Sequence, residues 1–150
     1  MSGRPAPTAV LLILVALAGR TARAQTIHRE LGLQAITLFG DRTAVGGGGY
    51  WAVRPSTRAR VSLFAGGGEV DGRGFARGEL LAHFLLAPGK RRGVAPYAAG
   101  GIAVDAASRT EARVVAVVGL EGRPGARSGW IIEGGVGGGW RLAAGWRWRR

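Results

Sequence analysis

The 150-residue sequence contains no cysteine. This absence excludes a cysteine-linked lipid anchor, structural disulfides, thiol catalysis and cysteine-bound metal sites. Small exported domains often depend on disulfides for stability, so an exported chain without them must close its fold by other means.

Long apolar runs are also absent, since the longest, Ala9–Gly19, has only eleven residues. A membrane-spanning helix needs ~20 such residues, which argues against the alternative of an N-terminal membrane anchor. Arg4 precedes this run, and Ala22-Arg23-Ala24 follows it as a small-x-small cleavage pattern. We therefore expect a secretory signal peptide over residues 1–24, cleaved between Ala24 and Gln25. Its removal takes three arginines away and lowers the net charge from +12 to +9.

Glycine, by contrast, is abundant, with 28 residues that show no collagen-like period. The glycines lie among valine, leucine, isoleucine and tryptophan, a composition that disfavours disorder. Residues 25–150 also show no convincing amphipathic helix. Glycines scattered through apolar positions indicate β-structure in which backbones or bulky neighbours approach closely.

Apolar residues alternate with other residues in segment after segment of residues 25–150. The pattern is clear over residues 30–36, 77–86, 113–121 and 140–148. In each segment one face is apolar, whereas the other is mixed and carries nearly all the charge. This period of two predicts β-strands.

Turn-forming residues separate these segments at regular intervals. Seven connections are expected, at residues 40–43, 54–57, 69–73, 87–90, 105–110, 123–126 and 137–139. Seven connections imply eight strands, and eight strands of ~10 residues with short turns need roughly 120 residues. We therefore expect one domain over residues 25–150.

Eight short antiparallel strands fit either a soluble β-domain or a membrane barrel. Export without an anchor, small residues on the charged face and aromatic residues near strand ends favour the membrane barrel. The aromatic residues expected to form an interfacial girdle are Trp51, Tyr97, Trp130, Trp140 and Trp148. The fold class is thus an all-β, eight-stranded antiparallel up-and-down transmembrane β-barrel. A soluble periplasmic β-domain that binds an apolar ligand is the alternative.

The charged face of such a barrel points into a lumen that side chains just fill. Buried charges must be paired there, so we expect a structural charge network. Its expected members are Glu30, Arg77, Glu79, His83, Arg113, Glu121, Glu133, Arg141 and Arg147, with Arg58 and Arg60 on the same face. The excess of arginine keeps open a second reading, a narrow anion-preferring pore.

Three segments resemble small bacterial outer-membrane β-barrel proteins, of the type of outer membrane proteins A and X. Residues 94–103 resemble a Pro-Tyr…Gly-x-Gly strand opening, residues 119–124 and 130–133 resemble the next hairpin, and residues 139–148 are similar to the last strand. The resemblance spans residues 25–150. It implies an outer-membrane location and assembly through the C-terminal strand. The family usually ends in Phe or Trp, whereas Arg149 and Arg150 follow Trp148 here.

Enzymes occur on this scaffold, notably lipid A deacylases and palmitoyltransferases. The deacylases pair histidine and serine two positions apart on one strand face, but no serine lies near His83 in sequence, and His28 is followed by Arg29 and Glu30. Two distant histidines do not make a metal site. The glycine runs at 46–49, 66–68 and 134–139 lack the Lys-Ser/Thr and helix of a phosphate loop. We therefore expect no catalytic site, metal or cofactor, with a lipid-modifying enzyme as the alternative.

The positive net charge predicts an anionic partner. The arginines are spread along the chain, and the only basic cluster outside the C-terminus is Lys90–Arg92. Nucleic acid is therefore not expected. Outer-membrane lipid and lipopolysaccharide are the expected partners, together with the barrel-assembly machinery. Lys90–Arg92 is expected on the periplasmic rim, in a short solvated turn.

Overall fold

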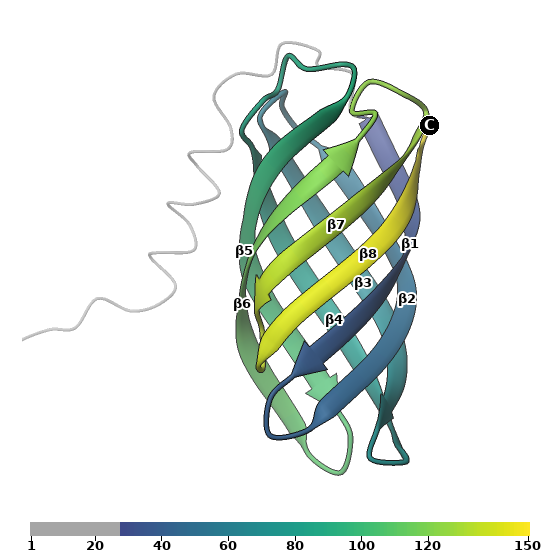
Figure 1. Cartoon of the computed structure of the whole chain (residues 1–150), viewed down its shortest axis with the longest axis vertical. Coiled ribbons are helices and arrows are strands. Elements are labelled where there is room, and N and C mark those ends of the chain that lie inside the picture. Colours follow the sequence, from purple (N-terminus) through teal and green to yellow (C-terminus); the bar gives the residue numbers. More distant parts are fainter. Residues whose placement is uncertain (1–27) are drawn as a thin grey trace, which may run out of the picture.

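The computed structural model describes residues 28–150. The expected signal peptide, residues 1–24, therefore lies outside the described residues. Eight strands make up nearly all of the described chain (Figure 1). They are β1 His28–Phe39, β2 Thr43–Arg54, β3 Ala59–Val70, β4 Arg73–Leu85, β5 Val94–Ala106, β6 Thr110–Gly122, β7 Ser128–Val136 and β8 Trp140–Arg149.

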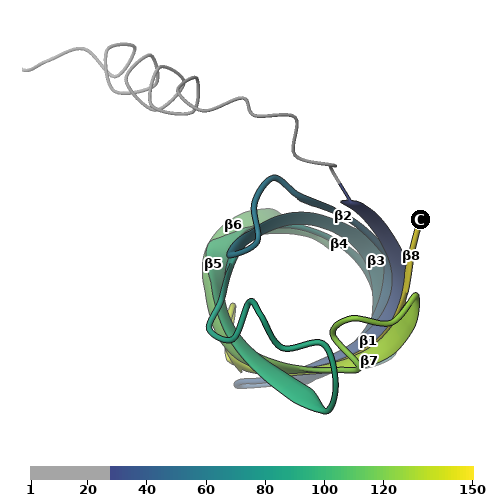
Figure 2. The same ribbon diagram turned by 90° about the horizontal axis from the view of Figure 1, so that it is seen from above.

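The strands form a closed antiparallel barrel in sequence order. Each strand pairs with the next, and β1 closes the ring by pairing with β8 from Glu30↔Arg149 to Phe39↔Trp140. Figure 2 shows the ring from above. The prediction of an eight-stranded up-and-down barrel is confirmed. Within residues 28–150, no helix is long and apolar enough to cross a membrane.

The outer face of the wall is apolar and the inner face holds the charges. Val114 is 78% exposed and Val118 67%, whereas the alternate residues Val115 and Val117 are buried. Glu30, Glu79 and Arg141 point inward and are at most 2% exposed. This is the inverse of a soluble barrel, which would place charge outside and apolar residues inside. The strand faces predicted from the alternation are confirmed.

Glycines line the wall where β2 and β3 pair, at Gly46↔Gly68, Gly47↔Gly67 and Gly48↔Gly66. A Cβ atom added to Gly48, on the inner face, would lie 2.5 Å from the Cα atom of Gly66. Any side chain there would collide with the neighbouring backbone. These glycines therefore permit the close approach of two strands that a narrow barrel requires.

Both described chain ends lie at one end of the barrel, here called the terminal end; the opposite end is the distal end (Figure 1). The distal connections have only two or three residues, and Asp71 and Gly72 form one of them. Both adopt positive φ, 50° and 73°, as a two-residue type I′ hairpin turn requires. The terminal connections are longer, and residues 86–93 make the longest. Lys90–Arg92 therefore lies in an extended connection, and the expectation of a short turn there is wrong.

Candidate functional site: the ion-paired lumen and its two mouths

The terminal half of the lumen holds two carboxylates among four arginines. Glu30 and Glu121 each lie within 3.7 Å of the guanidinium groups of all four arginines. The shortest pairs join Arg149 Nε to Glu30 Oε1 at 2.6 Å and Arg54 Nε to the same oxygen at 2.7 Å. This terminal cluster consists of Glu30, Arg54, Arg60, Glu121, Arg147 and Arg149.

The distal half of the lumen holds a second cluster, in which carboxylates outnumber the buried arginines. Arg141 donates to Glu133 at 2.7 Å and to Glu79 at 3.0 Å. Arg77 donates to Glu79 at 2.7 Å and to Asp105 at 2.6 Å. These two arginines and three carboxylates form the distal cluster.

Glu133, at the inner edge of the distal cluster, also accepts hydrogen bonds from neutral donors. Gln34 Nε2 and the Tyr97 hydroxyl each donate to this carboxylate at 2.8 Å. Arg60 of the terminal cluster stacks over the Tyr97 ring, with 4.7 Å from Cζ to the ring centroid. Tyr97 therefore joins the two clusters into one contiguous polar core.

This polar core leaves almost no free space in the middle of the barrel. The internal cavity between Gln34, His83 and Glu133 has a volume of about 10 Å³, which is room for no more than about one water molecule. Within residues 28–150, this cavity is too small to hold a hydrated ion.

Aromatic residues lie on the outer face at two levels. Trp51, Trp146 and Trp148 are 41–45% exposed near the terminal end, while Trp140 is 71% exposed at the distal end next to Phe39. Eight residues at ~3.3 Å each and a tilt of roughly 40° separate Trp140 from Trp148 by about 20 Å along the axis. Outer-membrane barrels carry an apolar band of ~25 Å between aromatic girdles, so the outer face has bilayer dimensions.

The fold has clear counterparts among solved structures, although no family model and no curated protein matches the chain. The N-terminal β-barrel domain of Pseudomonas aeruginosa OprF matches with a TM-score of 0.61 and 15% identity, over 81% of this chain and 97% of that domain. Neisserial surface protein A (NspA) matches with a TM-score of 0.62 and 8% identity, over 83% and 97%. The de novo designed TMB2.3 matches with a TM-score of 0.56 and 16% identity, also over 83% and 97%.

This chain has the fold of the small outer-membrane β-barrels. At these identities the likeness concerns the fold alone, and one fold can carry many functions. What this outer-membrane-type barrel does must be argued from its own side chains.

The barrel brings a serine to His83, although none lies near it in the sequence. Ser62 of β3 reaches across to His83 of β4, with 2.7 Å between Ser62 Oγ and His83 Nε2. On the other side of the ring, Arg60 Nη2 lies 2.9 Å from His83 Nδ1. A guanidinium can only donate, so Nδ1 accepts and the proton of the neutral ring is on Nε2.

This tautomer is the wrong one for acyl transfer. A general base needs a free lone pair toward the hydroxyl that it activates. Here Nε2 donates to Ser62, and an arginine occupies the place of the carboxylate that would orient the histidine. Both side chains are also buried in the lumen, away from the lipid face. The pair is therefore explained as a hydrogen-bonded part of the polar core.

Of the arginines expected in the lumen network, Arg113 lies at its edge and Arg58 lies outside it. Arg113 is partly exposed at the distal rim, where it pairs with Asp105 of the distal cluster at 3.4 Å and with Glu111. It lies too near the end of β6 to be covered by neighbouring strands. Arg58 is exposed because it belongs to the β2–β3 connection rather than to a strand.

The sequence reasoning also missed two members of the terminal cluster, Arg54 and Arg149. Both continue an inward-facing series, since Arg54 follows Tyr50 and Ala52, and Arg149 follows Arg147. The alternation of inward and outward residues along a strand, here called parity, is enough to place both arginines in the lumen. The expected turn at residues 54–57 includes Arg54, and Arg149 follows Trp148, the residue expected to end the last strand.

Tyr97 does not belong to the aromatic girdle. It is 1% exposed and points into the lumen, on the same face as Ala95 and Ala99. Proximity to a strand end suggested the girdle, but strand parity decides the face. Across the pair, a Cβ atom on Gly119 would overlap the Tyr97 ring, so this glycine makes the space for the inward tyrosine. Trp130, the remaining expected member, is half-buried.

Proposed function

We propose that this protein is a non-enzymatic, structural β-barrel of the outer membrane whose lumen is closed by its own ion pairs. Three observations support the proposal: an apolar outer face of bilayer dimensions, a mid-lumen cavity of about 10 Å³, and arginines and carboxylates paired across the interior. Soluble binding of an apolar ligand would require the opposite arrangement, an apolar interior and a polar exterior.

The proposed orientation places the terminal end in the periplasm and the distal end at the cell surface. The distal connections of two or three residues offer little area to a large protein partner, so lipid and lipopolysaccharide are the partners proposed there. No nucleic-acid partner is proposed.

The C-terminal strand retains a form suited to the assembly machinery. Because Arg149 points inward to Glu30, Trp148 is the last residue of β8 on the outer face. The backbone N–H of Arg150 donates to the carbonyl oxygen of Arg29 at 3.0 Å. We propose that the machinery reads β8 with Trp148 as its terminal aromatic residue.

Two measurements test the proposal. The folded barrel should migrate differently before and after boiling on a denaturing gel, and it should resist extraction from membranes by carbonate. In a planar bilayer, the same preparation should show no single-channel conductance. Unchanged migration together with release by carbonate contradicts the membrane location, whereas stable anion-selective steps contradict the closed lumen and support the pore.

A further inference from the structure

The terminal mouth of the barrel is a basin surrounded by cations. Its cavity has a volume of about 890 Å³ and is formed by the three terminal connections together with the ends of β1, β2 and β8. Six basic side chains line it, and within residues 28–150 no aspartate or glutamate side chain does. These side chains are Arg54, Lys90, Arg91, Arg127, Arg149 and Arg150.

The rim of this basin is held by backbone hydrogen bonds between two connections. The N–H of Gly125 donates to the carbonyl of Arg91 at 3.0 Å, and the N–H of Arg123 donates to the carbonyl of Gly93 at 2.8 Å. The β4–β5 and β6–β7 connections are thereby fixed to each other at the opening of the ring (Figure 2). The cationic side chains are thus carried on an ordered frame.

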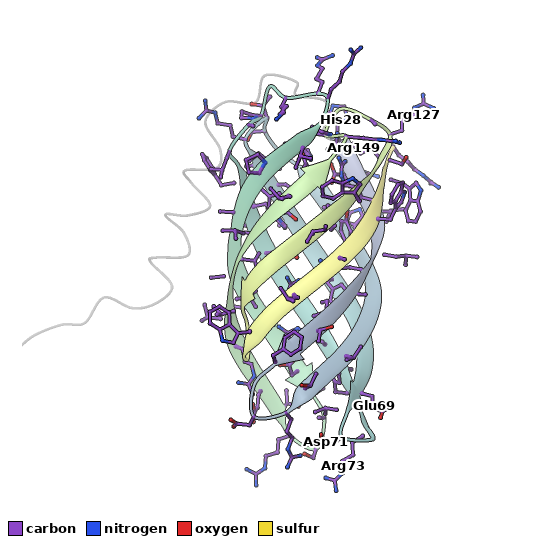
Figure 3. The ribbon with its side chains drawn as sticks, viewed as in Figure 1. His28, Glu69, Asp71, Arg73, Arg127 and Arg149 are labelled. Atoms are coloured by element: carbon purple, nitrogen blue, oxygen red, sulfur yellow. The ribbon has the colours of Figure 1, made fainter. Side chains whose placement is uncertain are left out.

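The floor of the basin adds positive charge instead of neutralising the rim. Arg54 and Arg149 belong to the terminal cluster, in which four arginines meet only two carboxylates. Arg149 Nη2 and, beneath it, Arg147 Nε and Nη1 are buried and have no hydrogen-bond partner within residues 28–150. His28, Arg127 and Arg149 appear together at this end in Figure 3. Each of these atoms faces a carboxylate of the terminal cluster only at 3.7 Å, so the charge surplus continues beneath the basin.

The distal mouth provides an internal comparison. Its cavity of about 430 Å³ is lined by three arginines and three carboxylates, so its formal charge is balanced. These are Arg42, Arg109, Arg113, Asp41, Asp105 and Glu111. The surplus of positive charge is therefore specific to the terminal mouth and is not a general property of a basic protein.

We propose that the terminal basin is a binding site for a compact anion that carries several phosphate groups. Guanidinium groups match phosphate oxygens through paired, charge-assisted hydrogen bonds. One monovalent ion could not balance the excess of the rim cations over the two carboxylates of the terminal cluster, and the volume lies within the ~300–1,000 Å³ typical of small-molecule sites. This inference rests on the proposed function, in which the middle of the lumen is closed. The basin then opens only at the terminal end, so that it holds its ligand instead of conducting it.

Inorganic tripolyphosphate is the probe for this site. Isothermal titration calorimetry with the folded barrel in a zwitterionic detergent, at low salt, should show saturable binding that weakens as salt is added. In the double variant Arg91→Gln/Arg127→Gln, the affinity should fall about tenfold, because two solvent-exposed ionic contacts are lost. Both side chains are exposed rim residues outside the terminal cluster, so the barrel itself should fold normally.

The matched control is Arg42→Gln/Arg109→Gln, which removes the same net charge at the distal mouth. When both variants are compared in ~0.1 M salt, where the Debye length is about 10 Å, its affinity for tripolyphosphate should stay within about twofold of the parent protein, because the distal charges are screened. Equal losses in the two double variants, or no saturable binding by the parent protein, would overturn the proposal. Heat-dependent migration and conductance are independent readouts, so these failures are separable from those of the proposed function.

The phosphate could come from a soluble molecule or from a lipid headgroup. Titration in nanodiscs of phosphatidylglycerol and of phosphatidylcholine distinguishes these sources. If a lipid headgroup occupies the basin, tripolyphosphate should bind more weakly in phosphatidylglycerol, and Arg91→Gln/Arg127→Gln should abolish that difference. Equal affinities in the two lipids assign the site to a soluble phosphate compound.

Discussion

The terminal and distal halves of the lumen bury the same kinds of side chain at different charge ratios. In the terminal half, four arginines surround two carboxylates, and Arg147 approaches neither carboxylate closer than 3.7 Å. It donates instead to the carbonyl oxygen of Arg123 at 3.2 Å. In the distal half, Arg141 makes direct hydrogen bonds to two carboxylates. The contribution of a buried charge to stability therefore depends on its partners and not on its depth.

Neutral hydrogen bonds explain how the distal half accommodates its extra carboxylate. Glu133 accepts from Gln34 and Tyr97 as well as from Arg141, and these donors stabilise the ionised form without adding charge. The terminal half places its surplus arginines against neutral acceptors, since Arg147 donates to the carbonyl oxygen of Arg123 and Arg60 donates to His83 Nδ1. These acceptors add no negative charge, so the positive surplus remains. That surplus lies under the basin whose rim adds further cations.

The largest expected effect comes from removing the central arginine of the distal cluster. Arg141→Met leaves Glu79 and Glu133 buried with fewer partners and should lower the free energy of unfolding by about 3–5 kcal/mol. Arg147→Met, equally buried, should cost less than about 1 kcal/mol, because it removes a surplus charge. Urea unfolding followed by tryptophan fluorescence measures both. Equal losses would show that the charge ratio does not distinguish the two halves.

The second-largest expected loss of stability depends on how deep in the membrane a charge is placed on the outer face of β6. Val118→Arg, within the apolar band, should cost about 2–4 kcal/mol in a bilayer, and Thr110→Arg, at the distal rim of the same face, about 0–1 kcal/mol. Unfolding in phospholipid vesicles compares the two variants. If Thr110→Arg destabilises as strongly as Val118→Arg, the distal rim is embedded in the membrane and the proposed boundary is wrong.

A smaller effect is expected where β2 and β3 approach each other in the distal half. In Gly48→Ala, the new methyl group would overlap the backbone of Ala65 and Gly66, at an expected cost of about 1–3 kcal/mol. Gly49→Ala adds the same group on the outer face, where the nearest atom is 3.7 Å away, and should change stability by about 0.5 kcal/mol or less. Unfolding free energies of the pair test this; a reversed order would contradict the close strand approach.

The alternation of side chains allowed most of the barrel to be predicted from the sequence. Parity placed Glu79, His83, Arg141 and Arg147 on the inner face, and each is buried there. It failed where it was not applied consistently. The expectation of Tyr97 in the girdle follows its place near a strand end and not its face, and Arg149, which continues the inward series of Arg147, is missing from the expected network.

Contacts between strands could not be predicted in this way. Ser62 and His83 are 21 positions apart in sequence and meet only because β3 and β4 pair in a particular register. Likewise, Arg149 reaches Glu30 only because β8 closes the ring against β1. No local pattern specifies such partners.

Alternation and turn residues were enough to predict eight strands, the approximate position of their connections and the face of most side chains. These are local properties, since a strand turns its side chains to opposite faces at every residue. The charge partners, the small size of the mid-lumen cavity and the excess of basic side chains at one mouth became visible only in the tertiary structure. Those features depend on the register and stagger of all eight strands, which are defined only when the ring closes.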